Sequence, residues 1–351
     1  MTSSTSNNDT GTSNTGTSNT STQWHLVSRP SGEPTGENVV RVAVDLPELG
    51  EGEVRVANEF LSVDPYMRGR MNAGRSYVPP FELGEPMTGA AVGRVTASRS
   101  ERFAVGDTVQ HQLGWRDVAQ GPEREFRAAP PVPGHPLSVY LGALGLTGIT
   151  AWVGLTQIAK VREGDVVFVS GAAGGVGTMV GQIARLKGAS RVIGSAGTAA
   201  KLELLQGKYG FDAVFNYRDG DVAGQLKNAA PGGIDVYFDN VGGDHLEAAL
   251  RVFNDGGRAA LCGSVGGYNS VGDDPGVRHL TNIITRGLTL QGFTMPSYYH
   301  LAPAFAAEMQ PWLAAGEIVY DETVVHGIDR AFEAFLGMMH GENVGKMIVA
   351  P

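Results

Sequence analysis

Apolar residues follow two different rhythms along this chain, and the rhythm changes near residue 140. Before that point, short valine-rich runs alternate with polar positions and are broken by glycine and proline, which is typical of strands joined by turns. We expect strands at 38–44, 52–57 and 90–95, and a turn at 103–109 that leads into another strand. This spacing predicts a partly open β-barrel, which ends at a proline-rich connector, 129–136.

Beyond the connector, apolar strands alternate with helical segments. Between the first two strands, the apolar residues of 176–187 recur at helical spacing. Such alternation implies a parallel sheet covered on both faces, and six strands complete a doubly wound dinucleotide-binding fold. The expected strands are 165–170, 191–195, 213–217, 234–239, 257–262 and 288–293.

The segment after about residue 297 contains a helix, a strand around 323–325, a second helix at 328–339 and a final strand at 346–349. We assign this segment to the first domain. The predicted fold class is therefore α/β, with a doubly wound parallel sheet at 143–296. The barrel domain is expected to comprise 23–142 and 297–351.

Composition narrows the classes of function. Residues 1–22 are almost entirely Ser, Thr, Asn and Gly, which predicts a disordered tail without the apolar core of a signal peptide. A net charge of -9 disfavours a nucleic-acid partner, and we find no apolar run of membrane-spanning length. The single cysteine, Cys262, excludes an internal disulfide and a cysteine-rich metal site, and it favours a reducing cytoplasm.

A glycine-rich loop carries the strongest local signal for a cofactor. It covers 170–177, directly after an apolar strand and at the start of an amphipathic helix. Glycine allows close approach of a pyrophosphate, and the start of the helix offers free N–H groups. The end of the second strand, 194–201, contains no acidic residue to bind the ribose of NAD. Thr198 and Lys201 are suited to the additional phosphate of NADP instead, so NADPH is the expected cofactor.

Other catalytic chemistries lack their residues. One cysteine cannot supply the ligands of a zinc alcohol dehydrogenase, and the eight histidines are scattered without a close metal-binding pair. We expect surface or capping roles for the histidines and no bound metal. No nucleophile elbow is found either. Hydride transfer without a metal remains the favoured chemistry.

Five motifs resemble one branch of the medium-chain dehydrogenases/reductases. They are 62–68 (SVDPYMR), 171–177, 238–243 (FDNVGG), 262–264 and 341–346 (GENVGK), in the same order along nearly all of 24–351. This branch comprises the zinc-independent leukotriene hydroxydehydrogenases, prostaglandin reductases and alkenal double-bond reductases. The resemblance implies a GroES-like catalytic domain, a Rossmann domain and a homodimer. It also implies NADPH-dependent reduction of the carbon–carbon double bond of α,β-unsaturated aldehydes or ketones.

The same resemblance assigns residues to the cofactor. It places the glycine loop on the pyrophosphate, a lysine and a tyrosine near the adenosine phosphate, and an asparagine beside the ribose or nicotinamide. Several of these contacts are expected to be made by the backbone. In the loop 263–269, two adjacent glycines at 266–267 depart from the usual pattern of the family. The residues assigned to the pyrophosphate are Gly174, Gly175, Val176 and Gly177. Those assigned to the adenosine phosphate are Lys201 and Tyr217, and the one assigned to the ribose or nicotinamide is Asn240. The groove is completed by Cys262, Gly263, Ser264, Tyr268, Phe293, Thr294, Met295 and Asn343.

Hydride transfer to the β-carbon of an enone leaves negative charge on the carbonyl oxygen, which requires a hydrogen-bond donor. Tyr268 is one candidate, because it follows the fifth strand at the edge of the sheet where ligands bind. Tyr66 of the other domain is a second candidate, and the ribose hydroxyl of the cofactor is a third. Tyr77 is expected to line the substrate entrance. Arg68 is expected to stabilise its turn or to contact a cofactor phosphate.

Three alternatives remain open at this stage. An NADPH-dependent quinone oxidoreductase would share the fold and the cofactor. A non-catalytic NADP-binding protein would bind the dinucleotide without consuming it, since a fold does not establish an activity. The third alternative is oxidation of an alcohol with NADP.

Overall fold

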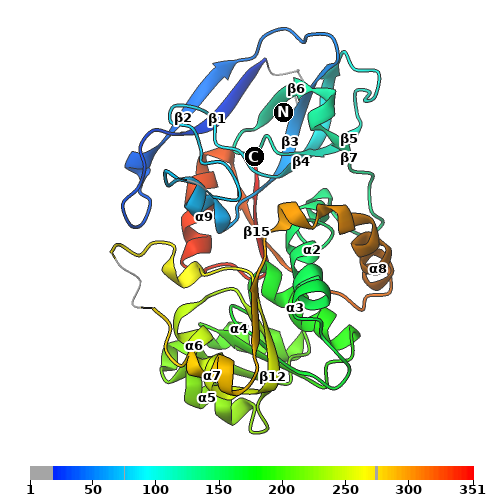
Figure 1. Cartoon of the computed structure of the whole chain (residues 1–351). Coiled ribbons are helices and arrows are strands. Elements are labelled where there is room, and N and C mark those ends of the chain that lie inside the picture. Colours follow the sequence, from blue (N-terminus) through cyan, green and yellow to red (C-terminus); the bar gives the residue numbers. More distant parts are fainter. Residues whose placement is uncertain (1–18, 75, 273–275) are drawn as a thin grey trace, which may run out of the picture.

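The chain forms two lobes joined along a central seam, in a computed structural model that describes residues 19–74, 76–272 and 276–351 (Figure 1). Most of the expected tail, residues 1–18, lies outside the described residues. The predicted end of that tail is wrong, because Thr20, Ser21 and Thr22 begin strand β1 (Thr20–Leu26). This segment pairs with 43–45, and the buried Ser21 hydroxyl donates to the carbonyl of Val118 at 2.7 Å. Backbone pairing therefore orders a segment whose composition alone does not favour a strand.

The first lobe is built mainly from antiparallel strands around a partly open barrel, with one parallel pair, β14 and β15. Its main sheet has the order β14-β15-β3-β4-β5-β7, β6 pairs with β3, and β1 and β2 form a separate ribbon. Gly93 lets β4 lie close to β3, because a Cβ there would sit 2.1 Å from the carbonyl oxygen of Ala57. The strands are β2 (Val39–Asp45), β3 (Glu53–Ser62), β4 (Ala91–Ser98), β5 (Thr108–His111), β6 (Val118–Pro122), β7 (Arg127–Ala128), β14 (Glu322–His326) and β15 (Lys346–Ala350).

Two strands near the end of the chain, at Glu322–His326 and Lys346–Ala350, join the main sheet of this lobe. Strand β15 pairs with β3, where Ile348 opposes Ser62. Helix α9 (Ala331–Met339) packs on β15 through Phe335, in one hydrophobic cluster with Trp115. Helix α8 (Ala302–Ala314) behaves differently, since its buried side chains belong to the core of the second lobe. Contacts of the segment after residue 297 are thus divided between the lobes.

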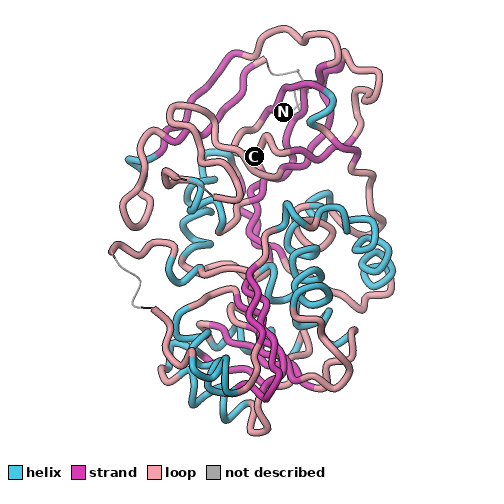
Figure 2. Tube along the Cα trace, in the orientation of Figure 1, coloured by secondary structure: helices cyan, strands magenta, loops and turns pink. Residues whose placement is uncertain are grey.

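The second lobe contains a parallel sheet with the order β10-β9-β8-β11-β12-β13, shown in magenta in the lower half of Figure 2. This is the strand order 3-2-1-4-5-6 of a doubly wound dinucleotide-binding fold, so the predicted fold class is confirmed. The strands are β8 (Val166–Val169), β9 (Arg191–Ala196), β10 (Ala213–Asn216), β11 (Ile234–Asp239), β12 (Phe253–Leu261) and β13 (Thr289–Gly292).

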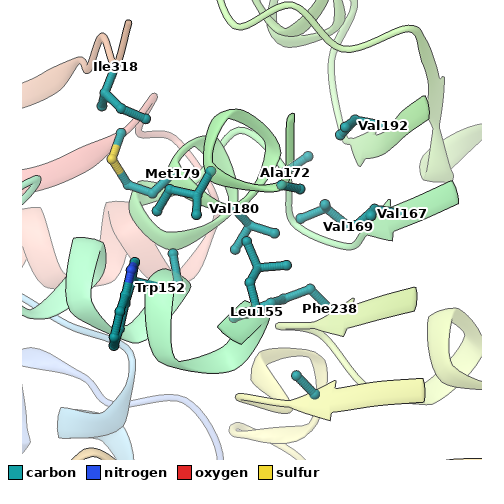
Figure 3. Packing of buried hydrophobic residues seen from close by; sticks show 14 of the residues in the cluster. Trp152, Leu155, Val167, Val169, Ala172, Met179, Val180, Val192, Phe238 and Ile318 are labelled. Carbon is teal, nitrogen blue, oxygen red and sulfur yellow. The ribbon is translucent and has the colours of Figure 1, made fainter. Parts of the chain in front are cut away.

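Helices cover both faces of this sheet because its strands are apolar on both sides. On β8, Val167 and Val169 face one hydrophobic cluster, whereas Phe168 faces the other, as the two-residue period of a strand requires. Figure 3 shows the first cluster, in which Trp152 and Val180 come from the covering helices. The helices of the chain not yet given are α1 (Tyr66–Arg70), α2 (Leu146–Val153), α3 (Gly175–Leu186), α4 (Ala199–Gly207), α5 (Val222–Ala229), α6 (Gly243–Val252) and α7 (Thr281–Thr285).

Within the described ranges, the helices are too short or too polar to span a lipid bilayer.

Candidate active site

The glycine loop lies between β8 and α3, as predicted, and its glycines are required by close backbone contacts. Gly171 has a φ of +59°, which disfavours any residue with a side chain. A Cβ on Gly177 would lie 2.4 Å from the carbonyl oxygen of Gly171. Gly174 precedes the first turn of α3 and offers no side-chain cap, so the N–H groups at the start of this helix stay available. The loop therefore fits a pyrophosphate, which is drawn to a helix N-terminus.

The segment before β15 closes against this loop from the other lobe. The N–H of Gly345 donates to the carbonyl of Ala173 at 2.8 Å, and Gly174 and Gly345 form a parallel bridge. Asn343 is buried and donates from Nδ2 to the carbonyl of Gly345 at 2.7 Å. The structure thus brings Asn343 beside the glycine loop, where its amide stabilises the turn that contacts the loop.

A basic corner lies at the end of β9. Thr198 caps α4 by accepting from the N–H of Lys201 at 3.4 Å, and the Lys201 ammonium donates to the carbonyl of Gly341. A Cβ on Gly197 would lie 2.9 Å from the Tyr217 hydroxyl and 3.1 Å from Nε of Arg218. The predicted Lys201 and Tyr217 therefore both lie near the end of β9, Lys201 in the helix after it and Tyr217 against Gly197.

Arg218 is a member of this corner that the sequence analysis missed. Burial, followed by the nearby Arg218 guanidinium, lowers the pKa of Lys201. Neither cation forms an ion pair with another residue in the part of the chain that the structure describes. Two close positive charges without a carboxylate fit the additional phosphate of NADP better than a bare ribose. The sequence signal was the basic residue directly after Tyr217.

Asn240 connects the glycine loop to the next strand of the sheet. Its backbone N–H donates to the Ser170 hydroxyl at 3.0 Å, and its Nδ2 donates to the Ser170 carbonyl at 2.8 Å. The preceding Asp239 is buried and accepts from the Tyr237 hydroxyl and from the N–H of Gly242. Burial raises the pKa of Asp239, and these hydrogen bonds oppose the shift. Asp239, another residue that the sequence analysis missed, thus holds the turn that follows β11 in place.

The loop after β12 folds back over the end of β11. The N–H groups of Cys262 and Gly263 donate to the carbonyl of Asp239, at 2.9 and 3.1 Å. Ser264 lies against Gly242, whose added Cβ would meet its Oγ at 2.5 Å. Gly266 is also closely packed, because a Cβ there would lie 3.1 Å from the carbonyl oxygen of Val241. A larger residue at position 266 would therefore press on the backbone of Val241.

The residues after β13 lie at the same edge of the sheet. Phe293 packs edge-on against Phe238, with ring centroids 6.3 Å apart. Thr294 begins a short turn, since its carbonyl accepts from the N–H of Ser297 at 3.3 Å. Met295 is buried in the hydrophobic core. Of these predicted cofactor residues, Met295 is thus available to a ligand mainly through its backbone.

Four tyrosines converge between the two lobes. The hydroxyls of Tyr66, Tyr77 and Tyr268 come from α1, the segment after it and the loop after β12, and Tyr299 joins them. Burial, followed by the neighbouring Tyr268, raises the pKa of Tyr77 to about 12. Burial likewise raises the pKa of the other three hydroxyls. All four therefore stay protonated at neutral pH and can donate hydrogen bonds. The sequence analysis missed Tyr299, which carries no motif.

A buried ion pair supports this cluster. The Lys346 ammonium lies 3.0 Å from the Asp64 carboxylate and also donates to the carbonyl of Val63 at 2.7 Å. Asp64 is close enough to Tyr66 and Tyr299 to raise the pKa of both hydroxyls. The pair thereby joins β15 to the segment that carries Tyr66.

The histidines of the chain lie in different environments, and some of them are buried. Among the described residues, no group of three or more His, Cys, Asp or Glu side chains is arranged to hold a metal ion. The expectation of surface or capping roles for all histidines is wrong for His111 and His245, which are both 4% exposed. His111 bonds to Oδ1 of Asn58, and His245 stacks on Phe168. Both rings act as apolar packing surfaces with a polar edge.

Comparisons with known proteins agree with this geometry. Residues 22–128 match the family described as the N-terminal domain of oxidoreductase, and residues 175–311 match the one described as zinc-binding dehydrogenase. The NADP-dependent 2-alkenal reductase of Nicotiana tabacum is 40% identical over 88% of this chain and 90% of its own length. The NADPH-dependent curcumin reductase of Escherichia coli is 38% identical over 93% of this chain and 96% of its own.

A solved structure is similar over almost the whole fold. The crystal structure of CurA from Vibrio vulnificus in complex with NADPH superposes with a TM-score of 0.89 and is 40% identical. The alignment covers 94% of this chain and 98% of that one. On these similarities, the chain belongs to the medium-chain dehydrogenases/reductases, in the branch of NADP-dependent alkenal, curcumin and prostaglandin reductases.

Proposed function

We propose that this protein uses NADPH to reduce the carbon–carbon double bond of α,β-unsaturated aldehydes or ketones. The observation that supports this most directly is the convergence of protonated tyrosines, including Tyr66 and Tyr268, at the edge of the sheet that also carries the glycine loop. A parallel α/β sheet binds its ligands at this edge. The printed activities of the relatives, alkenal and curcumin reduction, are of the same class.

The residues of the chain have separable tasks in this reaction. Gly174, Gly175, Val176 and Gly177 would hold the pyrophosphate, and Lys201 with Arg218 would bind the adenosine phosphate. When bound, NADPH supplies a hydride to the β-carbon of the substrate.

Negative charge then develops on the carbonyl oxygen of the substrate. Tyr268 would donate a hydrogen bond to this oxygen, because its phenol is protonated at neutral pH and its loop follows β12 at the ligand-binding edge of the sheet. Tyr66 is the second donor of the proposal, and the half-exposed Tyr77 would line the entrance. The α-carbon finally takes a proton from solvent.

Three further properties belong to the proposal. We infer zinc-independent chemistry, since the lone Cys262 is no zinc-binding set. A homodimer is supported by strand β13, which ends the order of its sheet, and by the apolar side chains of Leu280 and Ile284 beside it, 55% and 83% exposed. Location in a reducing cytoplasm also stays a prediction. The same holds for the domain bounds, which are 23–142 with 297–351 for the barrel domain and 143–296 for the dinucleotide-binding domain.

The test is a spectrophotometric assay of NADPH oxidation with graded enals, enones and a benzoquinone, repeated with NADH. We expect enals or enones to be reduced, with the saturated carbonyl compound as product, and NADH to be a poor donor. Turnover of the benzoquinone alone would favour a quinone oxidoreductase. NADPH binding without turnover of any compound would favour a non-catalytic role, and turnover that requires stoichiometric zinc would contradict the metal-free chemistry.

Two variants test the donors within the same assay. Tyr268→Phe removes a single hydroxyl and should lower kcat on an enone about 10²–10³-fold, the usual effect of losing one oxyanion donor. Tyr66→Phe provides the matched comparison for the second hydroxyl. If Tyr268→Phe retains full turnover, the donor role of Tyr268 is wrong.

A further inference from the structure

Helix α1 carries a buried guanidinium two residues after Tyr66. Arg68 is only 3% exposed, and each of its nitrogens has an acceptor. Nε donates to Oδ1 of Asn269 at 2.9 Å, Nη1 to Oδ1 of Asn72 at 2.7 Å, and Nη2 to the carbonyl of Gly32 at 2.5 Å. One side chain thus links three segments that are far apart in the sequence.

All three acceptors are neutral. Among the residues that the structure describes, no carboxylate forms an ion pair with Arg68. Burial without a counter-charge is unfavourable, and it lowers the pKa of the Arg68 guanidinium below its usual value. A buried charge of this kind contributes more to the geometry of its partners than to the stability of the fold.

The partner Asn269 directly follows Tyr268 in the loop after β12. The beginning of this loop is anchored in its own lobe, because the N–H groups of Val265 and Gly266 donate to the carbonyls of Asn240 and Val241, at 3.2 and 3.1 Å. The anchor beyond Tyr268 is a side-chain contact across the seam, from Arg68. Tyr268 therefore lies between one anchor in each lobe.

The segment around Gly32 strengthens the second anchor. Gly32 has a φ of +79°, and a Cβ there would lie 3.2 Å from the side chain of Val271. Its carbonyl is the acceptor of Arg68 Nη2. The guanidinium of Arg68, which is 3% exposed, is thus enclosed where the segment around Gly32 meets the loop that carries Asn269.

We propose that Arg68 is a positioning residue, which acts through Asn269 to hold the Tyr268 hydroxyl where the carbonyl oxygen of the substrate gains charge. Because Arg68 and Tyr66 share the short helix α1, the same contact sets the two tyrosines relative to each other across the seam. This inference rests on the proposed function, in which Tyr268 donates to that oxygen.

The experiment compares two asparagines that accept from the same guanidinium. Asn269→Ala removes the acceptor on the Tyr268 loop, whereas Asn72→Ala removes the acceptor within the segment of Arg68 itself. We expect Asn269→Ala to lower kcat on an enone about tenfold, as misplacement of one donor would, with the KM for NADPH changed less than about twofold. Asn72→Ala should stay within about twofold of the wild type. Asn269→Asp, which keeps an acceptor, should restore most of kcat.

A double variant separates positioning from general damage. In a Tyr268→Phe background, Asn269→Ala should cause no further loss of kcat, since the hydroxyl that it positions is already gone. An equal loss in both backgrounds, or an equal effect of Asn269→Ala and Asn72→Ala, would overturn the role of Arg68.

Amide hydrogen exchange of residues 264–271 provides a readout other than activity. Exchange in this segment should rise in Asn269→Ala and not in Asn72→Ala, in the absence of cofactor and substrate. Unchanged exchange overturns the proposal whatever the kinetics show. Full turnover of Tyr268→Phe together with the expected exchange would instead refute only the donor role of Tyr268.

Discussion

The Lys346 ammonium and the Asp64 carboxylate form an ion pair 3.0 Å long, buried at the seam between the two lobes. Lys346→Met would leave Asp64 buried without its partner, which typically lowers the free energy of unfolding by about 3–5 kcal/mol. Asp64→Asn combined with Lys346→Met should recover part of this loss, because no charge then stays unpaired. Urea unfolding of the three proteins measures both effects. An equal loss of unfolding free energy in the double and the single variant would show that the unpaired charge of Asp64 is not what destabilises Lys346→Met.

The basic corner at Lys201 and Arg218 predicts the cofactor preference. Arg218→Ala should lower kcat/KM for NADPH about 10–100-fold, the effect of losing a charged hydrogen bond to phosphate, and should leave NADH almost unaffected. Arg251→Ala is a matched control, because this exposed arginine lies at the far end of α6. Steady-state kinetics with both cofactors give the ratio of kcat/KM for NADPH to kcat/KM for NADH. Parallel losses for NADPH and NADH would contradict a phosphate contact.

The close packing of the glycine loop predicts that a single added methyl group strongly weakens NADPH binding. Gly177→Ala would place a Cβ 2.4 Å from the carbonyl oxygen of Gly171, so we expect at least about tenfold weaker NADPH binding, measured by fluorescence titration. Gly207→Ala is the control, since nothing lies within 4 Å of a Cβ at that position in α4. The control should raise the free energy of unfolding by about 0.5–1 kcal/mol. Normal binding by Gly177→Ala would argue against the loop as the pyrophosphate site.

The buried His245 predicts loss of stability in acid. Burial lowers the pKa of this imidazole to about 4 from the ordinary value of 6.5, and its Nε2 has no hydrogen-bond partner among the residues that the structure describes. Below pH 6.5 the unfolded chain therefore binds the proton more readily, and the free energy of unfolding falls as the pH drops toward 4, by about 3 kcal/mol for this residue.

His245→Phe should reduce this dependence on pH, because the new ring can still stack on Phe168. The exposed His326 provides the control substitution, His326→Phe. Urea unfolding between pH 4 and pH 7.5 gives the slope of the free energy of unfolding against pH for each protein. The upper limit lies about one unit above the ordinary histidine pKa, so that histidines there are mostly neutral. An identical slope in His245→Phe and the wild type would refute the assignment.

Local patterns predicted the parts of the fold that depend on local chemistry. The strand before Gly171 and the helix that begins at Gly175 lie within a few residues of their predicted positions, because apolar period and glycine content specify them directly. Contacts between distant segments were not predictable in this way. Arg218, Tyr299 and the contact of Arg68 with Asn269 depend on which loops the sheet brings together, and no local pattern records that.

Strand β1 is a segment for which the local composition predicted the wrong structure. The chain around Ser21 has the composition of a disordered segment, yet backbone pairing with β2 and a buried hydroxyl order it. Composition measures the apolar surface that a segment can bury and omits the hydrogen bonds that a neighbouring strand supplies.

The pairing of β15 with β3 also constrains how the protein is made. Strand β15 completes a sheet in which its partner β3 emerges from the ribosome about 280 residues earlier. During synthesis the edge of β3 near Leu61 therefore stays unpaired until β15 is made, whereas the doubly wound sheet already has all its strands by then. A nascent chain that stalls before Lys346 would retain a dinucleotide-binding lobe beside an open strand edge, which is a template for aggregation.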